Sequence, residues 1–386
     1  MPTRRICFLA VLSALFLYGS SASPFAQQPQ QLQKLDSINL ARAHEMLRQG
    51  YEEVKKNYYD PKYHGVDLDA LYHQYDARLN TSQTINESFR VIAAFLGSLQ
   101  DSHTFFMPPA RINRSTPGFH MEMVGDKCFV TRIRPGTDAA ARLHVGDEVL
   151  MFDGFNLRRA DFRNMQYFFQ VLSPAPVEKL DLASPTGERR QEIVRATIRS
   201  GKAVLDVTGS GSGNDLWNLV REDEEDTHLN RERIFEDGDA LIWKMPNFYI
   251  SQDTITSIFS KARKHKALVL DLRGNPGGSV DVLKYTLAHV FDHEVKLGDR
   301  VSRKNSKPES IKPIGPAYTG KLLVLVDGDS GSAAELFARV IQIEHRGTVI
   351  GDRSAGAVME ARHYDESTGS IPKFFMDTLS PRPISS

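Results

Sequence analysis

The sequence predicts an α/β fold preceded by an N-terminal helical domain and a β-rich domain. Three observations support this prediction. Apolar residues recur at three- and four-residue steps between residues 37 and 99, and short alternating runs with turn residues follow between 117 and 200. From residue 239 onward, apolar strands alternate with amphipathic helices. Such repeated strand–helix units favour a largely parallel sheet covered by helices.

The composition excludes several classes of protein. Of the 386 residues, 41% are hydrophobic, an ordinary share that excludes whole-chain disorder, collagen and a helical membrane protein. Lys and Arg together equal Asp and Glu at 48 each, so there is no net basic charge to hold nucleic acid. The length suggests two or three domains. The two cysteines, Cys7 and Cys128, cannot form a disulfide framework.

Residues 1–26 have the pattern of an export signal. Arg4 and Arg5 precede the apolar run 6–17, and small residues follow it. Because the run is too short to span a bilayer as a helix, we expect no stable membrane insertion after cleavage; an uncleaved anchor is the alternative. Cleavage would leave Cys128 without a disulfide partner. We therefore expect a periplasmic or secreted protein.

Residues 36–104 are predicted to form the N-terminal helical domain. A first helix starts at Ser37 and ends where Asp60-Pro61 interrupts the apolar pattern. Two further helices follow, and the last of them ends near Leu99. The pattern indicates a small packing module.

Residues 108–204 are predicted to form the β-rich domain, and they resemble a PDZ domain. The loop Gly118-Phe119 opens an alternating strand, a short helix follows, and a Gly-Asp-apolar pattern occupies 146–154. In the PDZ family, the backbone amides of this loop hold the terminal carboxylate of a peptide that adds to the sheet as a strand. The resemblance therefore implies that Gly118 and Phe119 bind peptide.

Residues 205–238 are predicted to be a linker or a surface hairpin. The acidic run 222–226, which follows Arg221, lacks the central glycine and the distal glutamate of a calcium-binding loop. His289 and His293 have the helical spacing of metal ligands but lack the adjacent glutamate. We therefore expect neither a metal nor another cofactor.

Two glycine-bearing turns, 273–278 and 327–332, follow the two most apolar strands of the predicted α/β domain at 239–373. In α/β sheets, sites gather at the carboxyl ends of strands. The second turn ends in Ser332 directly before a helix, whose N-terminal partial positive charge favours developing negative charge. Gly277 and Gly278 offer amides that no side chain obstructs. Taken singly, each turn is also compatible with an ordinary structural role.

In combination, the motifs resemble the tail-specific serine proteases, a family that includes C-terminal-processing peptidases and a tricorn-like branch. The motifs are Leu-Gln-Asp-Ser-His-Thr at 99–104, the PDZ-like segment, Asp-Leu-Arg-Gly-Asn-Pro-Gly-Gly at 271–278, Ser-Ala-Ala-Glu at 332–335 and Val-Ile-Gly-Asp at 349–352. The resemblance covers residues 40–365 and implies a ClpP/crotonase-like catalytic domain. It further implies a serine endopeptidase that cleaves exported polypeptides at unstructured or C-terminal segments.

The resemblance assigns the nucleophile to Ser332, because the family places its serine three positions before a glutamate, here Glu335. Ser330 is the alternative, since Gly-Asp-Ser-Gly also occurs in chymotrypsin-like proteases, but that fold is all-β and usually disulfide-bonded. The oxyanion donors of the family correspond to the amides of Ala333 and of Gly277 or Gly278.

The base follows the tricorn-like branch. C-terminal-processing members carry a lysine 25 positions after the serine, where this chain has Ala357. The tricorn-like branch uses a Ser-His pair, which Ser102-His103 matches, and histidine accepts a serine proton near neutral pH without a large pKa change. We therefore expect His103 to be the base of an acyl-enzyme mechanism and Ser102 to orient it. His345 and His363 are the alternative bases.

Residues 374–386 read as an atypical polar tail without periodicity. Tricorn-like members continue with further strands, so we expect a frameshifted or truncated gene product. A catalytically impaired, protease-like scaffold that holds peptide tails is the alternative function. The missing lysine and the short tail favour the scaffold, whereas Ser332, the Ser102-His103 pair and both glycine turns favour the enzyme.

Overall fold

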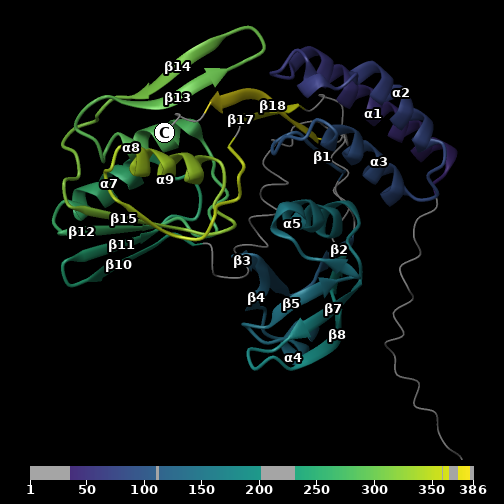
Figure 1. Ribbon diagram of the computed structural model, residues 1–386, viewed down its shortest axis with the longest axis horizontal. Coiled ribbons are helices and arrows are strands. Elements are labelled where there is room, and N and C mark those ends of the chain that lie inside the picture. The colour runs from purple at the N-terminus through teal and green to yellow at the C-terminus, as the bar shows by residue number, and fades with distance from the viewer. Residues whose placement is uncertain (1–34, 110–112, 201–230, 359, 365–372, 383–386) are drawn as a thin grey trace, which may run out of the picture. The chain divides into compact units, whose positions relative to one another are not determined.

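The computed structural model describes residues 35–109, 113–200, 231–358, 360–364 and 373–382 (Figure 1). The predicted export signal at 1–26 and most of the predicted linker at 205–238 lie outside these ranges. Within the ranges, no helix has both the length and the apolarity that a membrane span requires.

The first part of the chain is helical, as predicted. Its helices are α1 (Ser37–Asn57), α2 (Leu68–Leu79) and α3 (Ile85–Gly97), with a short 3-10 turn, η1 (Tyr63–Gly65), between the first two. The side chains of Asp36, Asp67 and Thr84 each accept a hydrogen bond from the N–H three residues along, which caps the helix that follows. The apolar faces of the helices share one core, which also includes Tyr58 and Phe106.

The β-rich part contains an antiparallel sheet with the strand order β3-β4-β5-β7-β8 and a short strand, β6, beside β5. The bounds are β3 (Phe119–Val124), β4 (Lys127–Ile133), β5 (Glu148–Phe152), β6 (Phe155–Asn156), β7 (Val177–Ala183) and β8 (Arg189–Arg195). Helices α4 (Asp138–Arg142) and α5 (Arg159–Gln166), the π-helical turn η2 (Tyr167–Leu172), and the pair β2 (Asn113–Thr116) and β9 (Thr197–Ser200) complete this part.

Strand β3 lies at the edge of that sheet. Met121 and Met123 enter the core of the β-rich part. Because side chains alternate along a strand, His120 and Glu122 project from the other face. Within the described ranges β3 pairs only with β4, so its second edge has no strand partner.

The α/β part is built on a five-stranded sheet with the order β10-β11-β12-β15-β16. The bounds are β10 (Arg233–Asp237), β11 (Ala240–Lys244), β12 (Ala267–Asp271), β15 (Lys321–Val326) and β16 (Thr348–Gly351). Only β10 runs antiparallel, so the predicted largely parallel sheet is confirmed. The helices α7 (Gln252–Ala262), α8 (Val280–Leu287) and α9 (Ala333–Ile343) lie beside this sheet (Figure 1) and share its core.

A further sheet was not predicted. Its order is β1-β18-β13-β14, with β17 also beside β18, and its bounds are β1 (Phe105–Met107), β13 (Val295–Val301), β14 (Ser306–Ile311), β17 (Glu360–Tyr364) and β18 (Lys373–Arg382). The expectation of an irregular tail from residue 374 is wrong as far as residue 382, because β18 pairs with β1, β13 and β17. All of these partners except β17 lie far away in the sequence, so local periodicity gives no signal for the strand.

Candidate active site

The two glycine-bearing turns lie against each other, after the parallel neighbours β12 and β15. The Gly331 N–H donates to the carbonyl oxygen of Asn275 at 2.9 Å, and the Ser330 hydroxyl donates to the carbonyl oxygen of Leu272 at 2.9 Å. Ser330 is 0% exposed. Its hydroxyl therefore joins the two turns from a buried position, which removes the reason to regard Ser330 as the nucleophile.

Ser332 stands at the junction of the second turn and helix α9. Its φ of +51° lies in the region that residues other than glycine seldom occupy, and such strain is concentrated at functional sites. The Ser332 N–H lies 2.8 Å from the Ala357 carbonyl oxygen and 3.0 Å from Oε2 of Glu335. A half-buried serine in a strained turn between a strand and a helix is typical of activated nucleophiles.

Gly277 lies directly beside this serine. A Cβ added to Gly277 would be 2.7 Å from the Ser332 Cβ and 2.9 Å from the Ala333 nitrogen. The φ of Gly277 is +106° and that of Gly278 is +145°, so both positions favour glycine. The predicted oxyanion donors on the two turns are therefore brought together next to Ser332.

The amides of these residues are used differently. The Gly277 N–H donates to Oδ1 of Asn275 at 2.8 Å, and the same side chain donates through Nδ2 to the Met245 carbonyl oxygen at 2.9 Å. No described hydrogen bond uses the N–H of Gly278 or of Ala333. The geometry therefore favours Gly278 over Gly277 as a donor to a bound oxyanion.

The carboxylate of Glu335 organises the loop around Ser332. It is 7% exposed, and Oε2 accepts from the N–H groups of Ser332 at 3.0 Å and Ala357 at 2.7 Å. Oε1 accepts from the Gly356 N–H at 2.7 Å and the Ser354 hydroxyl at 2.6 Å. This one side chain fixes both the serine and the segment 354–357.

His103 is held by its own neighbours in the helical part. The Ser102 hydroxyl lies 2.9 Å from its Nδ1, and the His103 N–H donates to Asp101 Oδ1 at 3.1 Å. Burial, assisted by the charge of Arg163 and opposed by that of Asp101, lowers the pKa of His103 to about 4. The imidazole is therefore neutral at physiological pH.

The predicted catalytic pair is only partly assembled. The structure brings Ser102 and His103 together, but no described hydrogen bond or ion pair joins His103 to Ser332. His345 follows the C-terminal end of α9, whereas Ser332 precedes its N-terminal end. For His363 only the backbone is described, in β17 opposite Phe375. The identity of the base stays a prediction.

Lys244 is a further basic group beside the first glycine turn. Burial lowers its pKa, although the carboxylate of Asp271 opposes that change. Its Nζ donates to the carbonyl oxygen of Arg273 and lies 3.5 Å from Oδ1 of Asp271. These contacts support the first turn, and none of them reaches Ser332.

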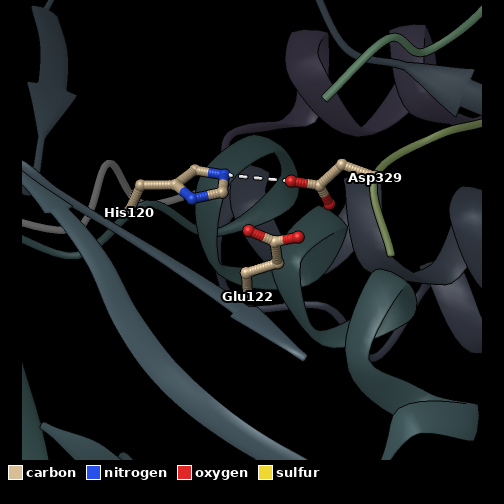
Figure 2. Close-up of side chains that lie close together, drawn as sticks. All are labelled: His120, Glu122 and Asp329. Carbon is tan, nitrogen blue, oxygen red and sulfur yellow. Dashed lines mark ion pairs between the residues drawn. The ribbon is translucent and has the colours of Figure 1, made fainter. Parts of the chain in front are cut away.

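Sequence analysis missed a cluster beside the serine turn. His120 and Glu122 of β3 converge on Asp329, three residues before Ser332 (Figure 2). Nε2 of His120 lies 3.4 Å from Oδ2 of Asp329. Burial and the charges of Asp327 and Asp329 raise the pKa of Glu122 to about 8. The available signal was the spacing of His120 and Glu122, which places them on one face of a strand.

The predicted peptide-binding residues lie where β3 begins. Gly118 has a φ of +82°, and a Cβ added there would meet the Thr137 side chain at 2.7 Å. Its carbonyl oxygen accepts from the Arg134 N–H at 2.8 Å, and Phe119 packs against the core of the β-rich part. Peptide binding at this loop stays a prediction.

Comparison with known proteins finds a peptidase family over the α/β part of the chain. Residues 241–377 match the model of peptidase family S41, and residues 41–97 match the tricorn protease C1 domain. The chain is 23% identical over 275 residues to a tail-specific protease of Haemophilus influenzae, covering 66% of this chain and 36% of that protein. It is 36% identical over 112 residues to a carboxy-terminal-processing protease of Bartonella bacilliformis, covering 27% and 25%. The chain thus spans about a third of the first relative and a quarter of the second.

Solved structures show the same fold. Mature CPAF has a TM-score of 0.64 at 16% identity, covering 89% of each chain. The photosystem II D1 C-terminal processing protease has a TM-score of 0.53 at 15% identity, covering 88% of each chain. These likenesses show the fold, and the family match assigns residues 241–377, which hold both glycine turns and Ser332, to a domain of peptidase family S41.

Proposed function

We propose that this protein is a serine peptidase whose nucleophile is Ser332. The observation that carries the proposal is the contact of Gly277 with Ser332, where an added Cβ would lie 2.7 Å from the serine Cβ. This contact sets the glycine turn beside the serine at the start of α9. The amides of Ala333 and Gly278 are the proposed oxyanion donors, because neither is used in a described hydrogen bond.

The proposed reaction is acyl transfer. The Ser332 hydroxyl loses its proton to a base while its oxygen attacks a peptide carbonyl carbon. The resulting oxyanion accepts hydrogen bonds from the two amides, and the N-terminal end of α9 favours its negative charge. Collapse of this intermediate breaks the C–N bond, and the protonated base gives its proton to the leaving amine. Water then hydrolyses the acyl-enzyme with the same base.

His103 is the proposed base. Its pKa of about 4 keeps the imidazole unprotonated, and the contact of Nδ1 with the Ser102 hydroxyl leaves Nε2 to receive a proton. The step requires Nε2 to come within hydrogen-bonding distance of the Ser332 hydroxyl. Because no described hydrogen bond joins His103 to Ser332, catalysis through His103 requires the imidazole and the serine hydroxyl to move into contact.

The proposed substrates are exported polypeptides with unstructured C-terminal segments. Support comes from the edge of β3 that pairs with no described strand, which a peptide can extend as an added strand in place of the side-chain contacts there, and from the Gly118-Phe119 loop at its start. The signal-like sequence at 1–26 supports action in the periplasm or outside the cell.

A peptide-holding scaffold without peptidase activity is the second candidate. One observation favours it: no described histidine or lysine side chain hydrogen-bonds to the Ser332 hydroxyl. Ala357 also stands where C-terminal-processing relatives carry a lysine, and it is 1% exposed.

Labelling with a fluorophosphonate separates the two candidates. A peptidase is labelled, and Ser332→Ala abolishes the label, whereas Ser260→Ala on the exposed face of α7 leaves it intact. A label that persists in Ser332→Ala would exclude Ser332 as the nucleophile. An unlabelled protein that binds an unstructured peptide in a fluorescence anisotropy assay would be the scaffold.

A further inference from the structure

His120, Glu122 and Asp329 place one imidazole and two carboxylates around a common point (Figure 2). One ligand atom from each lies within 4.8 Å of the other two. We propose that these three residues bind a divalent transition-metal ion of the zinc class. The site is separate from the peptidase chemistry proposed for Ser332, and its occupancy does not depend on that function.

The geometry fits tetrahedral coordination. Zinc–nitrogen and zinc–oxygen bonds of about 2.0–2.2 Å place neighbouring ligand atoms of a tetrahedron roughly 3.3–3.6 Å apart. Nε2 of His120 and Oδ2 of Asp329 are 3.4 Å apart, which matches that spacing and is long for a direct hydrogen bond. A carboxylate oxygen of Glu122 lies within 4.8 Å of a ligand atom of each of the other two residues.

A second interaction prepares the imidazole to act as a ligand. Nδ1 of His120 lies 3.0 Å from Oγ1 of Thr131 on the adjacent strand β4. When Nδ1 is the donor in this contact, Nε2 carries the lone pair of the neutral ring. The lone pair of Nε2 is then directed toward Asp329. Metal-bound histidines are held in this way by a partner on the other ring nitrogen.

The local charge also favours a cation. The acidic side chains of Glu122, Asp327 and Asp329 lie close enough to one another to interact, and Arg132 is a cation near them. Asp327 already accepts from the Gly274 N–H and the Asp329 N–H. The carboxylates proposed as ligands are those of Glu122 and Asp329, which lie with His120 around the common point.

The donor set indicates the class of metal. Calcium and magnesium favour sites made of oxygen atoms alone. An imidazole together with carboxylates suits zinc and neighbouring transition metals, and three protein ligands leave a fourth position for water.

The metal would connect two segments that already touch. A Cβ added to Gly328 would lie 3.2 Å from the Met123 carbonyl oxygen, so the serine turn and β3 are in backbone contact. A metal ion held by His120, Glu122 and Asp329 would fix the strand that begins at the Gly118-Phe119 loop to the turn that ends at Ser332. The site therefore fits a structural clasp between the β-rich part and the serine turn.

Zinc binding to the full chain tests the proposal. Isothermal titration of the chelator-treated protein with Zn²⁺ should show one equivalent bound, and Co²⁺ should give the visible absorption of a tetrahedral site. His120→Asn, Glu122→Gln and Asp329→Asn should each remove this binding. Thr131→Val should weaken it by about 10–100-fold, as loss of a supporting partner does.

His293→Asn is the matched control. His293 also pairs with a carboxylate, that of Asp292 at 2.7 Å, but this pair is exposed and neither residue is one of the proposed ligands. The His293→Asn variant should bind zinc as the wild-type protein does. Far-UV circular dichroism checks that each variant is folded. The Co²⁺ spectrum is measured on the unaltered protein, so it tests the site even if a variant fails to fold. Absence of a saturable site, or equal binding by His120→Asn, would overturn the proposal. Ser332→Ala should bind zinc normally, so a failed peptidase assay does not affect this result.

Discussion

Gly277 and Ser332 are in such close contact that a Cβ on the glycine would lie 2.7 Å from the Cβ of the serine. The same added atom would lie 2.9 Å from the amide nitrogen of Ala333. The absence of a side chain at this position thus keeps open the space in which a substrate carbonyl would meet Ser332, the proposed nucleophile. The requirement for glycine here comes from the site as well as from the backbone conformation.

Gly277→Ala should abolish fluorophosphonate labelling of Ser332 and destabilise the protein. The methyl group must displace Ser332 or the Ala333 amide, and a φ of +106° adds backbone strain of about 1–3 kcal/mol. Gly187→Ala is the matched control, because its φ is +88° but nothing lies within 4 Å of the added atom. Equal labelling of the two variants would show that the contact does not matter to the site.

Glu335→Gln should lower both stability and labelling. The buried carboxylate accepts four hydrogen bonds, and an amide presents one accepting oxygen and one donating NH₂ to the same four donors. Leaving two of these donors without an acceptor should cost about 3 kcal/mol in the free energy of unfolding, measured by urea denaturation. Glu344→Gln, at the exposed C-terminal end of the same helix, should change neither quantity.

Local patterns were sufficient to predict the elements that carry Ser332, the proposed nucleophile. The apolar strands before both glycine turns and the helix that starts at Ala333 occur close to their predicted positions. The resemblance identified Ser332 and Glu335 through their spacing on one helix. Such signals survive because the residues involved are neighbours in the chain.

Contacts between distant segments could not be predicted in the same way. The tail strand β18 owes its structure largely to partners such as β1, which lies at the other end of the described chain. In the sequence, His120 and Glu122 show only the alternation of an ordinary strand. Their proximity to Asp329 follows from the fold. The buried side chain of Asn275 accepts from the Gly277 N–H, so of the two glycines only Gly278 has an N–H available to a bound oxyanion. This contact could be seen only in the structure.

His103 should make the protein less stable in mild acid. Its folded-state pKa of about 4 lies below the ordinary value of 6.5, so the unfolded chain binds more protons between these two pH values. The free energy of unfolding should therefore fall as the pH falls from 6.5 to 4, by up to about 3 kcal/mol from this residue. Above pH 6.5 the contribution is constant.

His103→Asn removes this titration, so its stability should decline less steeply than that of the wild-type protein over the same pH range. Urea denaturation at intervals between pH 4 and 7 measures the difference. His293→Asn, which alters an exposed histidine, should follow the wild-type curve. Parallel curves for wild type and His103→Asn would mean that His103 is not buried as a neutral imidazole.

Arg159 should contribute far more to stability than its neighbour Arg158. The Arg159 guanidinium is paired with Asp352 and donates to the carbonyl oxygens of Gly125 at 2.6 Å and Met123 at 3.2 Å. Arg159→Ala leaves these acceptors and the carboxylate without their cation, which should cost about 2–4 kcal/mol in urea denaturation. Arg158→Ala breaks only an exposed pair and should cost less than about 0.5 kcal/mol. Arg159 thus connects Met123 in β3 to Asp352, the last residue of the Val-Ile-Gly-Asp motif. If Arg159→Ala and Arg158→Ala lowered the free energy of unfolding equally, this ion pair would not hold β3 to the α/β part.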